Sequence, residues 1–192
     1  MKRSIAFAIR ARAEASGLST RPKKSSGATR GVAKEPSAAY LAASPEPTVP
    51  VRSLLDVNVL IALLDADHLH HRRASDWLAD NLALGWASCA TTQNACIRLM
   101  SHPAYPNALP AARVTERLRA AASTAHHRFV TEALSLLDTE RFDAERLLGH
   151  RSVTAAFLLG LAVQNDLRLV TFDATLPLQA VHGATLGHIV AL

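Results

Sequence analysis

One stretch of the chain has the pattern of a buried parallel strand that ends in an acid: Ser53-Leu54-Leu55-Asp56-Val57-Asn58-Val59-Leu60-Ile61-Ala62. A strand of this kind delivers its acid to the carboxyl edge of a sheet, where open α/β folds build their sites. A second run, Leu169-Val170-Thr171-Phe172-Asp173, has the same form. Two acids that converge there would suit a hard divalent cation such as Mg²⁺. The alternative is that each aspartate is only a helix cap or a turn residue.

The sequence between and around these two runs alternates between strand-like and helix-like patterns. Strands are expected at 53–56, 86–90, 128–130, 168–172 and 187–190. Helices are expected at 57–64, 68–81, through 97–100, 111–122 and 153–165. The helix starts are assigned from residues with capping side chains or a preset backbone angle: Asp67, Thr91 or Thr92, Pro110 and Ser152. Strands separated by helices predict an α/β fold with a parallel, right-handed sheet covered on both faces.

Charge is distributed unevenly along the chain. Residues 1–50 carry nine Lys or Arg against three acids, whereas residues 51–192 carry no Lys, twelve Arg and thirteen acids. The high isoelectric point therefore comes from the first segment and does not indicate that the folded part binds nucleic acid. Residues 1–50 hold too few large apolar groups to offset the entropy of ordering, so they are expected to be a disordered basic tail. Residues 51–192 suit one domain with its own core.

Hydropathy and cysteine content indicate a cytoplasmic protein. No apolar run approaches the roughly 20 residues of a membrane span, and the longest helical candidate is Val153–Val163. Cys89 and Cys96 form no recognisable disulfide framework and suit buried thiols in a reducing compartment. The chain is therefore expected to lie in the cytoplasm without a membrane segment.

Several ordered segments carry a resemblance to a known family. They are Leu54-Leu55-Asp56-Val57-Asn58-Val59-Leu60-Ile61-Ala62-Leu63-Leu64, Trp86-Ala87-Ser88-Cys89, Thr92-Gln93-Asn94, Ile97-Arg98, Ser101-His102-Pro103-Ala104-Tyr105, His127-Arg128-Phe129, Gly149-His150-Arg151-Ser152-Val153-Thr154 and Leu169-Val170-Thr171-Phe172-Asp173. With them, residues 53–190 resemble the PIN-domain ribonucleases, specifically the VapC toxins of bacterial toxin–antitoxin systems. The resemblance implies a three-layer α/β/α PIN-like fold with a mostly parallel central sheet. It also implies an endoribonuclease dependent on Mg²⁺ or Mn²⁺, a VapB-type antitoxin partner, an RNA substrate and a homodimer.

The family pattern has four acidic positions, and two of them are intact here. The first maps on Asp56 and the last on Asp173, which become the expected catalytic and metal-binding residues. The second maps on Gln93, whose amide oxygen can ligate a metal but carries no charge. The third maps on Ala155, which has no ligating atom in its side chain. Asn58 and Gln93 are thus expected only as neutral or outer ligands.

The missing acid leaves two functions open. Mg²⁺ is commonly held by one or two carboxylates together with waters and substrate phosphates, so Asp56 and Asp173 could still support an endoribonuclease with weakened metal affinity. The alternative is a catalytically degenerate PIN domain that binds antitoxin or RNA without cleaving it. Arg98 could contact a phosphate or pair with an acid.

The remaining polar clusters are expected to be surface features. One lies in residues 65–71 and is interpreted as a helix start with a solvated histidine face. The other lies in residues 138–145 and is interpreted as a solvated acidic face; the alternative is that one of its acids replaces the missing carboxylate. Residues 1–50 are a dispensable tail, an RNA-attracting arm or a mis-called upstream extension, because the resembled proteins begin near the position of Val51.

Overall fold

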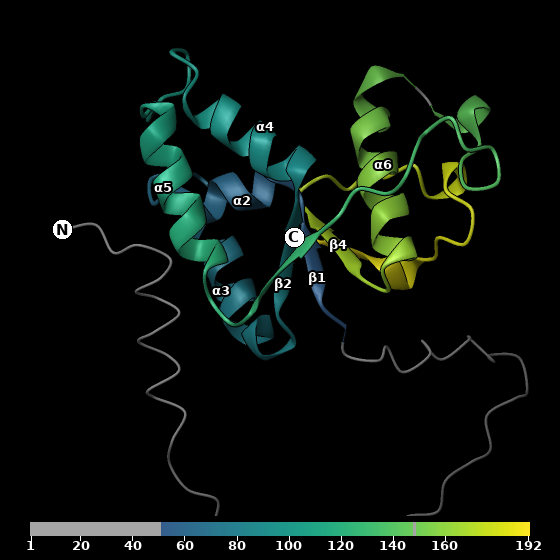
Figure 1. The fold of residues 1–192 in the computed structure, drawn as a ribbon, viewed down its shortest axis with the longest axis horizontal. Helices are drawn as coiled ribbons and strands as arrows, with labels where there is room; N and C mark the ends of the chain where they lie inside the picture. The colour runs from purple at the N-terminus through teal and green to yellow at the C-terminus, as the bar shows by residue number, and fades with distance from the viewer. Residues whose placement is uncertain (1–50, 148) are drawn as a thin grey trace, which may run out of the picture.

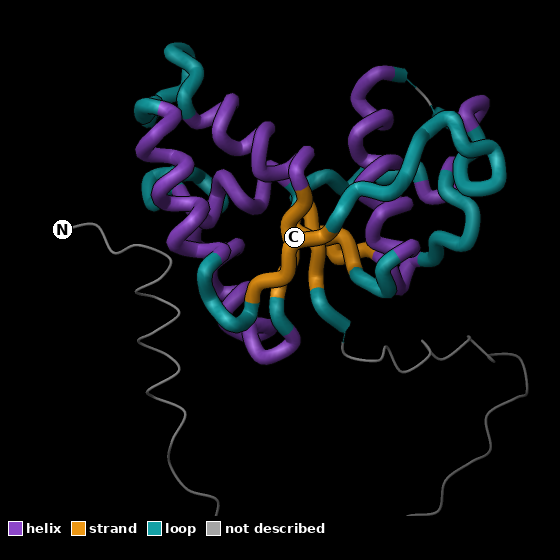
Figure 2. Tube along the Cα trace, viewed as in Figure 1, coloured by secondary structure: helices purple, strands orange, loops and turns teal. Residues whose placement is uncertain are grey.

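A parallel sheet forms the centre of the computed structural model, which describes residues 51–147 and 149–192 (Figures 1 and 2). The expectations for residues 1–50 lie outside the described part of the chain. The strands are β1 (Ser53–Leu55), β2 (Trp86–Cys89), β3 (His127–Val130), β4 (Arg168–Thr171) and β5 (Ile189–Ala191). Their order across the sheet is β3-β2-β1-β4-β5, and every pairing is parallel. The first strand in the sequence is therefore the central one, which explains why all three of its residues are buried.

Helices cover both faces of this sheet. They are α2 (Val57–Leu64), α3 (His71–Asn81), α4 (Ala90–Met100), α5 (Ala111–Ala122) and α6 (His150–Gln164). Figure 1 shows α2, α3, α4 and α5 on one side of the sheet and α6 on the other. The short 3₁₀ turns are Leu82–Leu84, Ala144–Arg146, Leu178–Ala180 and Leu186–His188. The predicted three-layer α/β/α architecture is confirmed.

The alternation of side chains along β1 creates two apolar layers. Leu55 points into the layer shared with α2, α3, α4 and α5, whereas Leu54 points into the layer shared with α6. Both side chains are fully buried, as expected for a strand that has helices on both faces. None of the helices in residues 51–147 and 149–192 is long and apolar enough to cross a membrane.

Three helix starts differ from the expected ones. Helix α3 begins at His71 with His70 as its N-cap, because residues 65–70 form turns held by their own backbone hydrogen bonds. Helix α4 begins at Ala90, because Thr92 bonds back to Cys89 from the third helical position instead of capping the helix. These starts are set by local hydrogen bonds, and the presence of a residue with a capping side chain does not determine them.

The start of α6 also moves relative to the expected Ser152 cap. Gly149 occupies the N-cap position at a φ of 100°, a backbone conformation that favours glycine. Ser152 instead donates its hydroxyl to the Gly149 carbonyl at 2.8 Å from within the helix. The predicted α2 and α5 are confirmed at both ends, whereas β4 ends at Thr171 and the last strand is β5 at Ile189–Ala191.

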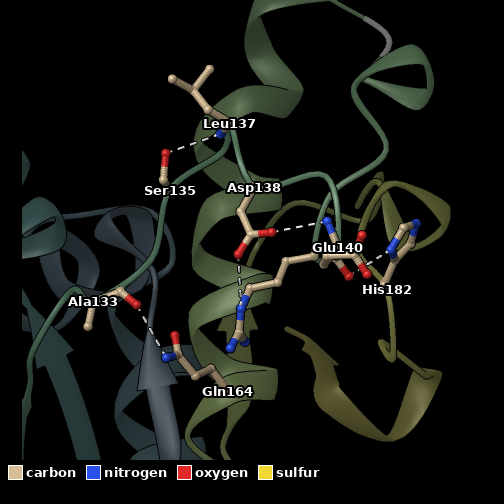
Figure 3. A network of polar contacts seen from close by, with 8 residues as sticks. Ala133, Ser135, Leu137, Asp138, Glu140, Gln164 and His182 are labelled. Carbon is tan, nitrogen blue, oxygen red and sulfur yellow. Dashed lines mark hydrogen bonds and ion pairs between the residues drawn. The ribbon is translucent and has the colours of Figure 1, made fainter.

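The acidic segment after β3 packs over α6. Phe142 lies against Gly160, where a Cβ atom would come within 2.5 Å of its ring, and it forms an isolated bridge with Val181. Figure 3 shows how the polar groups close this loop: Asp138 accepts from the Glu140 amide at 3.0 Å and pairs with Arg141 at 3.3 Å. Asp143 likewise pairs with Arg146 at 2.8 Å, so both aspartates of this segment are engaged within it.

Candidate metal site at the carboxyl edge of the sheet

Asp56 is fixed at the junction of β1 and α2. It is the N-cap of α2, and its Oδ1 atom accepts a hydrogen bond from the Val57 amide at 2.6 Å. Its own amide donates to the Val170 carbonyl at 3.0 Å, which continues the pairing of β1 with β4. The pairing of β1 with β4 therefore fixes the backbone position of Asp56, and the first turn of α2 fixes the orientation of its side chain.

Thr171 connects the two expected acids. It is the last residue of β4 and is fully buried. Its hydroxyl donates to Asp56 Oδ2 at 2.7 Å and accepts from the Asp173 amide at 3.1 Å. It also accepts from Asn58 Nδ2 at 3.0 Å, so its one proton and both lone pairs are used.

Asn58 joins α2 to the end of β4. Its Nδ2 atom lies 3.0 Å from Asp56 Oδ2, and its Oδ1 atom accepts from the Phe172 amide at 3.3 Å. The side chain expected as a neutral ligand therefore turns its nitrogen, and not its oxygen, toward Asp56. This geometry suits a residue that supports the acid more than one that binds a cation directly.

Burial and charge act together on Asp56. Burial raises the pKa of Asp56 above its ordinary value, and repulsion from the Asp173 carboxylate acts in the same direction. The hydrogen bonds from Thr171, Val57 and Asn58 lower the pKa but offset only part of the increase. Asp173 itself is exposed just beyond β4, where its Oδ1 atom accepts from the Thr175 amide at 2.8 Å. The structure thus brings the two predicted acids close enough to repel each other, a situation that a bound cation relieves.

The other two expected residues lie at opposite ends of α4. Gln93 is near its start, next to the carboxyl edge, and its Nε2 atom donates to Ser88 Oγ at 2.8 Å. Arg98 is exposed in the last turn, about 7 Å further along the helix axis. Gln93 is therefore placed beside the sheet edge, whereas Arg98 lies further from it.

The position that lacks an acid lies on the sheet-facing side of α6. Ala155 precedes Leu158, Leu159 and Ala162 by three, four and seven positions, and all three of these residues are buried in the apolar layer against the sheet. Because three residues connect the end of α6 to the amino end of β4, the helix runs back from the carboxyl edge. Ala155 therefore occupies the part of this buried row nearest to the edge that carries Asp56.

Glu132 is an acid at the same edge that was not predicted. It follows β3, and its Oε1 atom accepts from the Thr91 amide at 2.6 Å, in the first turn of α4. Burial raises the pKa of Glu132, but its hydrogen bonds with Thr91 and Cys89 outweigh burial and lower it overall. The signal was present in Val130-Thr131-Glu132, a short version of the strand-then-acid pattern seen at Asp56.

The polar cluster at 65–71 is not the solvated surface that was expected. Asp65 is only 6% exposed and accepts from the Tyr105 hydroxyl at 2.7 Å and from Asn107 Nδ2 at 2.9 Å. His70 stacks on Phe172 with ring centroids 4.6 Å apart, beside Asp173. The cluster therefore anchors the segment after α4 and packs against the end of β4. In the described part of the chain, no three His, Cys, Asp or Glu side chains come together as a ready metal site, so the candidate set stays the pair Asp56 and Asp173.

Comparison of the sequence with known proteins identifies the family of the chain. No protein-family model matches the chain. The chain is 46% identical to Ribonuclease VapC44 of Mycobacterium tuberculosis over 142 residues, which are 74% of this chain and 100% of that protein. It is 41% identical over 123 residues to Ribonuclease VapC38 and 38% identical over 123 residues to Ribonuclease VapC29 of the same species, in each case over 64% of this chain and 85% or 86% of the relative. Because the match includes the full length of a relative at this identity, the chain belongs to the VapC family of PIN-domain ribonucleases.

Proposed function

We propose that the chain is a Mg²⁺-dependent endoribonuclease, the toxin of a VapBC toxin–antitoxin pair, with the metal ion held by Asp56 and Asp173. The observation that carries the proposal is that one hydroxyl, of Thr171, holds both acids at the carboxyl edge of a parallel sheet, because it donates to Asp56 Oδ2 and accepts from the Asp173 amide. The relatives are named ribonucleases, which supports hydrolysis of RNA phosphodiester bonds.

The donor atoms fit a hard divalent cation. An ionised carboxylate offers about four lone-pair directions. Asp56 uses one on Oδ1 for the Val57 amide and two on Oδ2 for Thr171 and Asn58. Asp173 uses one on Oδ1 for the Thr175 amide. Each acid thus retains capacity for an ion, and Mg²⁺ is commonly held by one or two carboxylates with waters and substrate phosphates completing the shell.

Asp56 and Asp173 differ in how firmly they are held and in how exposed they are. A bound divalent cation supplies a Lewis acid for the phosphate and a lowered pKa for an attacking water. Thr171 and the start of α2 hold Asp56 in one orientation, whereas Asp173 is exposed and open to substrate. Mn²⁺ is an alternative ion, because it accepts the same oxygen ligands.

The alternative function is a degenerate PIN domain that binds its antitoxin or RNA without cleavage. Ala155 favours it, because this residue lies in the sheet-facing row of α6 near the edge and offers no ligand. Under either function, the proposed partners are a VapB-type antitoxin, RNA and a second copy of the chain. Arg98 is the proposed phosphate contact.

A metal titration separates the two functions. The full chain is titrated with Mg²⁺ and with Mn²⁺ and followed by calorimetry and thermal unfolding, and cleavage of total RNA is assayed in parallel. Asp56→Asn and Asp173→Asn should each abolish both the metal-induced rise in Tm and the cleavage. Asp76→Asn is the matched control, because Asp76 is exposed and pairs with Arg72 on the outer face of α3, away from the sheet edge. A wild-type chain that neither binds a divalent cation nor cuts RNA would establish the degenerate alternative.

A further inference from the structure

A hydrogen-bonded series of three polar side chains, Gln93, Ser88 and His127, runs from α4 into the sheet. Gln93 Nε2 donates to Ser88 Oγ at 2.8 Å, and Ser88 Oγ lies 2.8 Å from His127 Nε2. Ser88 is fully buried on β2, and His127 is half-buried on the neighbouring strand β3. The nuclease site described above uses neither Ser88 nor His127.

The two hydrogen bonds that Ser88 makes with Gln93 and His127 depend on each other. A serine hydroxyl has one proton to donate, and a neutral histidine has one ring nitrogen that accepts. Burial lowers the pKa of His127, and the nearby positive charge of Arg52 lowers it further, against an opposing contribution from the Ala122 carbonyl. When the proton of the neutral ring is on Nδ1, Nε2 accepts from Ser88, and Ser88 Oγ must then accept from Gln93 Nε2.

The opposite arrangement needs the other tautomer. If Nε2 carried the proton, it would donate to Ser88, whose own proton would then be free to donate to the Gln93 carbonyl, so the amide would no longer be held in one orientation. The His127 ring packs against Trp86, with ring centroids 4.3 Å apart. Rotating His127 away from Ser88 would therefore cost this contact. Only the tautomer with its proton on Nδ1 therefore holds the Gln93 amide in one orientation.

The orientation of the Gln93 amide matters because only one of its two ends can bind a cation. Its oxygen attracts a metal ion, whereas its nitrogen presents two N–H groups that repel one. With the nitrogen bound to Ser88, the Gln93 oxygen is directed away from Ser88. Gln93 lies near the start of α4, directly after the strand that pairs with β1, and therefore at the same edge of the sheet as Asp56.

We propose that Ser88 and His127 are positioning residues that hold the Gln93 amide with its oxygen available to the metal ion bound by Asp56 and Asp173. The inference rests on the proposed function and adds to it how a neutral side chain is made to act as a defined oxygen ligand. Gln93 would contact the ion, whereas Ser88 and His127 act through Gln93.

The first test needs no metal and no substrate. The full chain is labelled with ¹⁵N-histidine, and its long-range ¹H–¹⁵N spectrum is recorded at neutral pH with His127→Gln as the assignment control. The expected pattern for His127 is a neutral ring with the proton on Nδ1 and an unprotonated Nε2. A proton on Nε2 would overturn the proposal.

The second test is a double-mutant cycle read out as Mg²⁺ affinity. Ser88→Ala should weaken Mg²⁺ binding on the order of tenfold, as is usual when a residue that orients a metal ligand is removed. In a Gln93→Glu background, Ser88→Ala should change Mg²⁺ affinity by less than about twofold, because a carboxylate presents an oxygen in either orientation. A role for Ser88 in packing alone predicts equal losses in both backgrounds and would contradict the proposal.

Ser53→Ala is the matched control. Ser53 is a buried serine on β1, paired in register with Trp86, and its Oγ atom has no hydrogen-bond partner in the described part of the chain. Its removal should leave Mg²⁺ affinity unchanged. If Mg²⁺ fails to bind the wild type, the proposed function fails and this inference with it. If binding depends on Asp56 but the cycle shows no coupling between Ser88 and Gln93, only this inference is overturned.

Discussion

Thr171 donates its hydroxyl proton to Asp56 at 2.7 Å, although the two residues are 115 positions apart in the sequence. The same oxygen accepts from the amide of Asp173. One buried hydroxyl therefore holds the side chain of one candidate ligand and the backbone of the other. The bond is charge-assisted when Asp56 is ionised, which makes it stronger than a neutral hydrogen bond.

Replacing Thr171 by valine should therefore affect both stability and metal binding. Thr171→Val keeps the shape but leaves the Asp173 amide and the Asp56 carboxylate without their partner, which should cost about 1–3 kcal/mol of unfolding free energy. Mg²⁺ affinity should fall on the order of tenfold. Denaturant unfolding and calorimetry measure the two effects, and Thr171→Ser should restore most of both. Equal behaviour of the valine and serine variants would show that the hydroxyl is not needed.

Removing the charge of Asp56 should change how stability depends on pH. Burial, with a further contribution from Asp173, raises the pKa of Asp56 above its unfolded value of 3.8. The stability that this group contributes is therefore fully present below the unfolded pKa and is lost as pH rises through the folded pKa. Without metal, the Tm difference between Asp56→Asn and wild type should move in favour of the variant from pH 3 to pH 7. Mg²⁺ at neutral pH should raise the Tm of the wild type only, and an unchanged difference across this pH range would contradict the argument.

Restoring an acid at position 155 should strengthen the metal site. Ala155→Asp adds a third carboxylate and is expected to tighten Mg²⁺ binding about tenfold or more, or roughly 1.4 kcal/mol, and to raise RNA cleavage. Ala155 is the sixth residue of α6 and not the third as the sequence suggested, so little of the gain should come from the helix dipole. Thr154→Asp is the control, because Thr154 is exposed on the same turn of the helix. If both variants bind Mg²⁺ alike, position 155 does not face the ion.

The buried carboxylate of Asp65 should stabilise the fold at neutral pH. Burial raises the pKa of Asp65, but the hydrogen bonds from Asn107, Tyr105 and the Asp67 amide outweigh it and lower the pKa overall. A lowered pKa means that this stability is present above the unfolded pKa and is lost as pH falls through the folded pKa. Asp65→Asn should cost about 2 kcal/mol at pH 7 and clearly less at pH 3, as measured by urea unfolding at both pH values. A loss that is the same at pH 3 and pH 7 would mean that charge is not responsible.

The sequence predicted those features that depend on short segments. The apolar runs ending at Asp56 and Asp173 were sufficient to place both acids at one sheet edge, and α5 was predicted at its observed ends. The spacing of apolar residues is a local signal, so it predicts an element correctly where that element buries its apolar side chains in the core.

The features that were missed depend on contacts between distant segments. Nothing near Asp65 indicates that Tyr105 and Asn107 will bury it, because they lie 40 and 42 positions further along the chain. Thr171 looked like one more β-branched strand residue until its pairing with β1 placed its hydroxyl on Asp56. Similarly, the roles of Ser88 and His127 follow from the pairing of β2 with β3, and no spacing within either strand reveals them.

The order of the strands also determines when the site can exist during synthesis. The central strand β1 is made early, but β4, which completes its second side and carries Thr171 and the approach to Asp173, is made after about seven-eighths of the chain. Pairing between such distant segments cannot precede their translation. A ribosome that stops before residue 168 therefore releases a fragment that has Asp56 but lacks Asp173, the second candidate carboxylate. If the two carboxylates act as proposed, the candidate site can form only after most of the messenger has been translated.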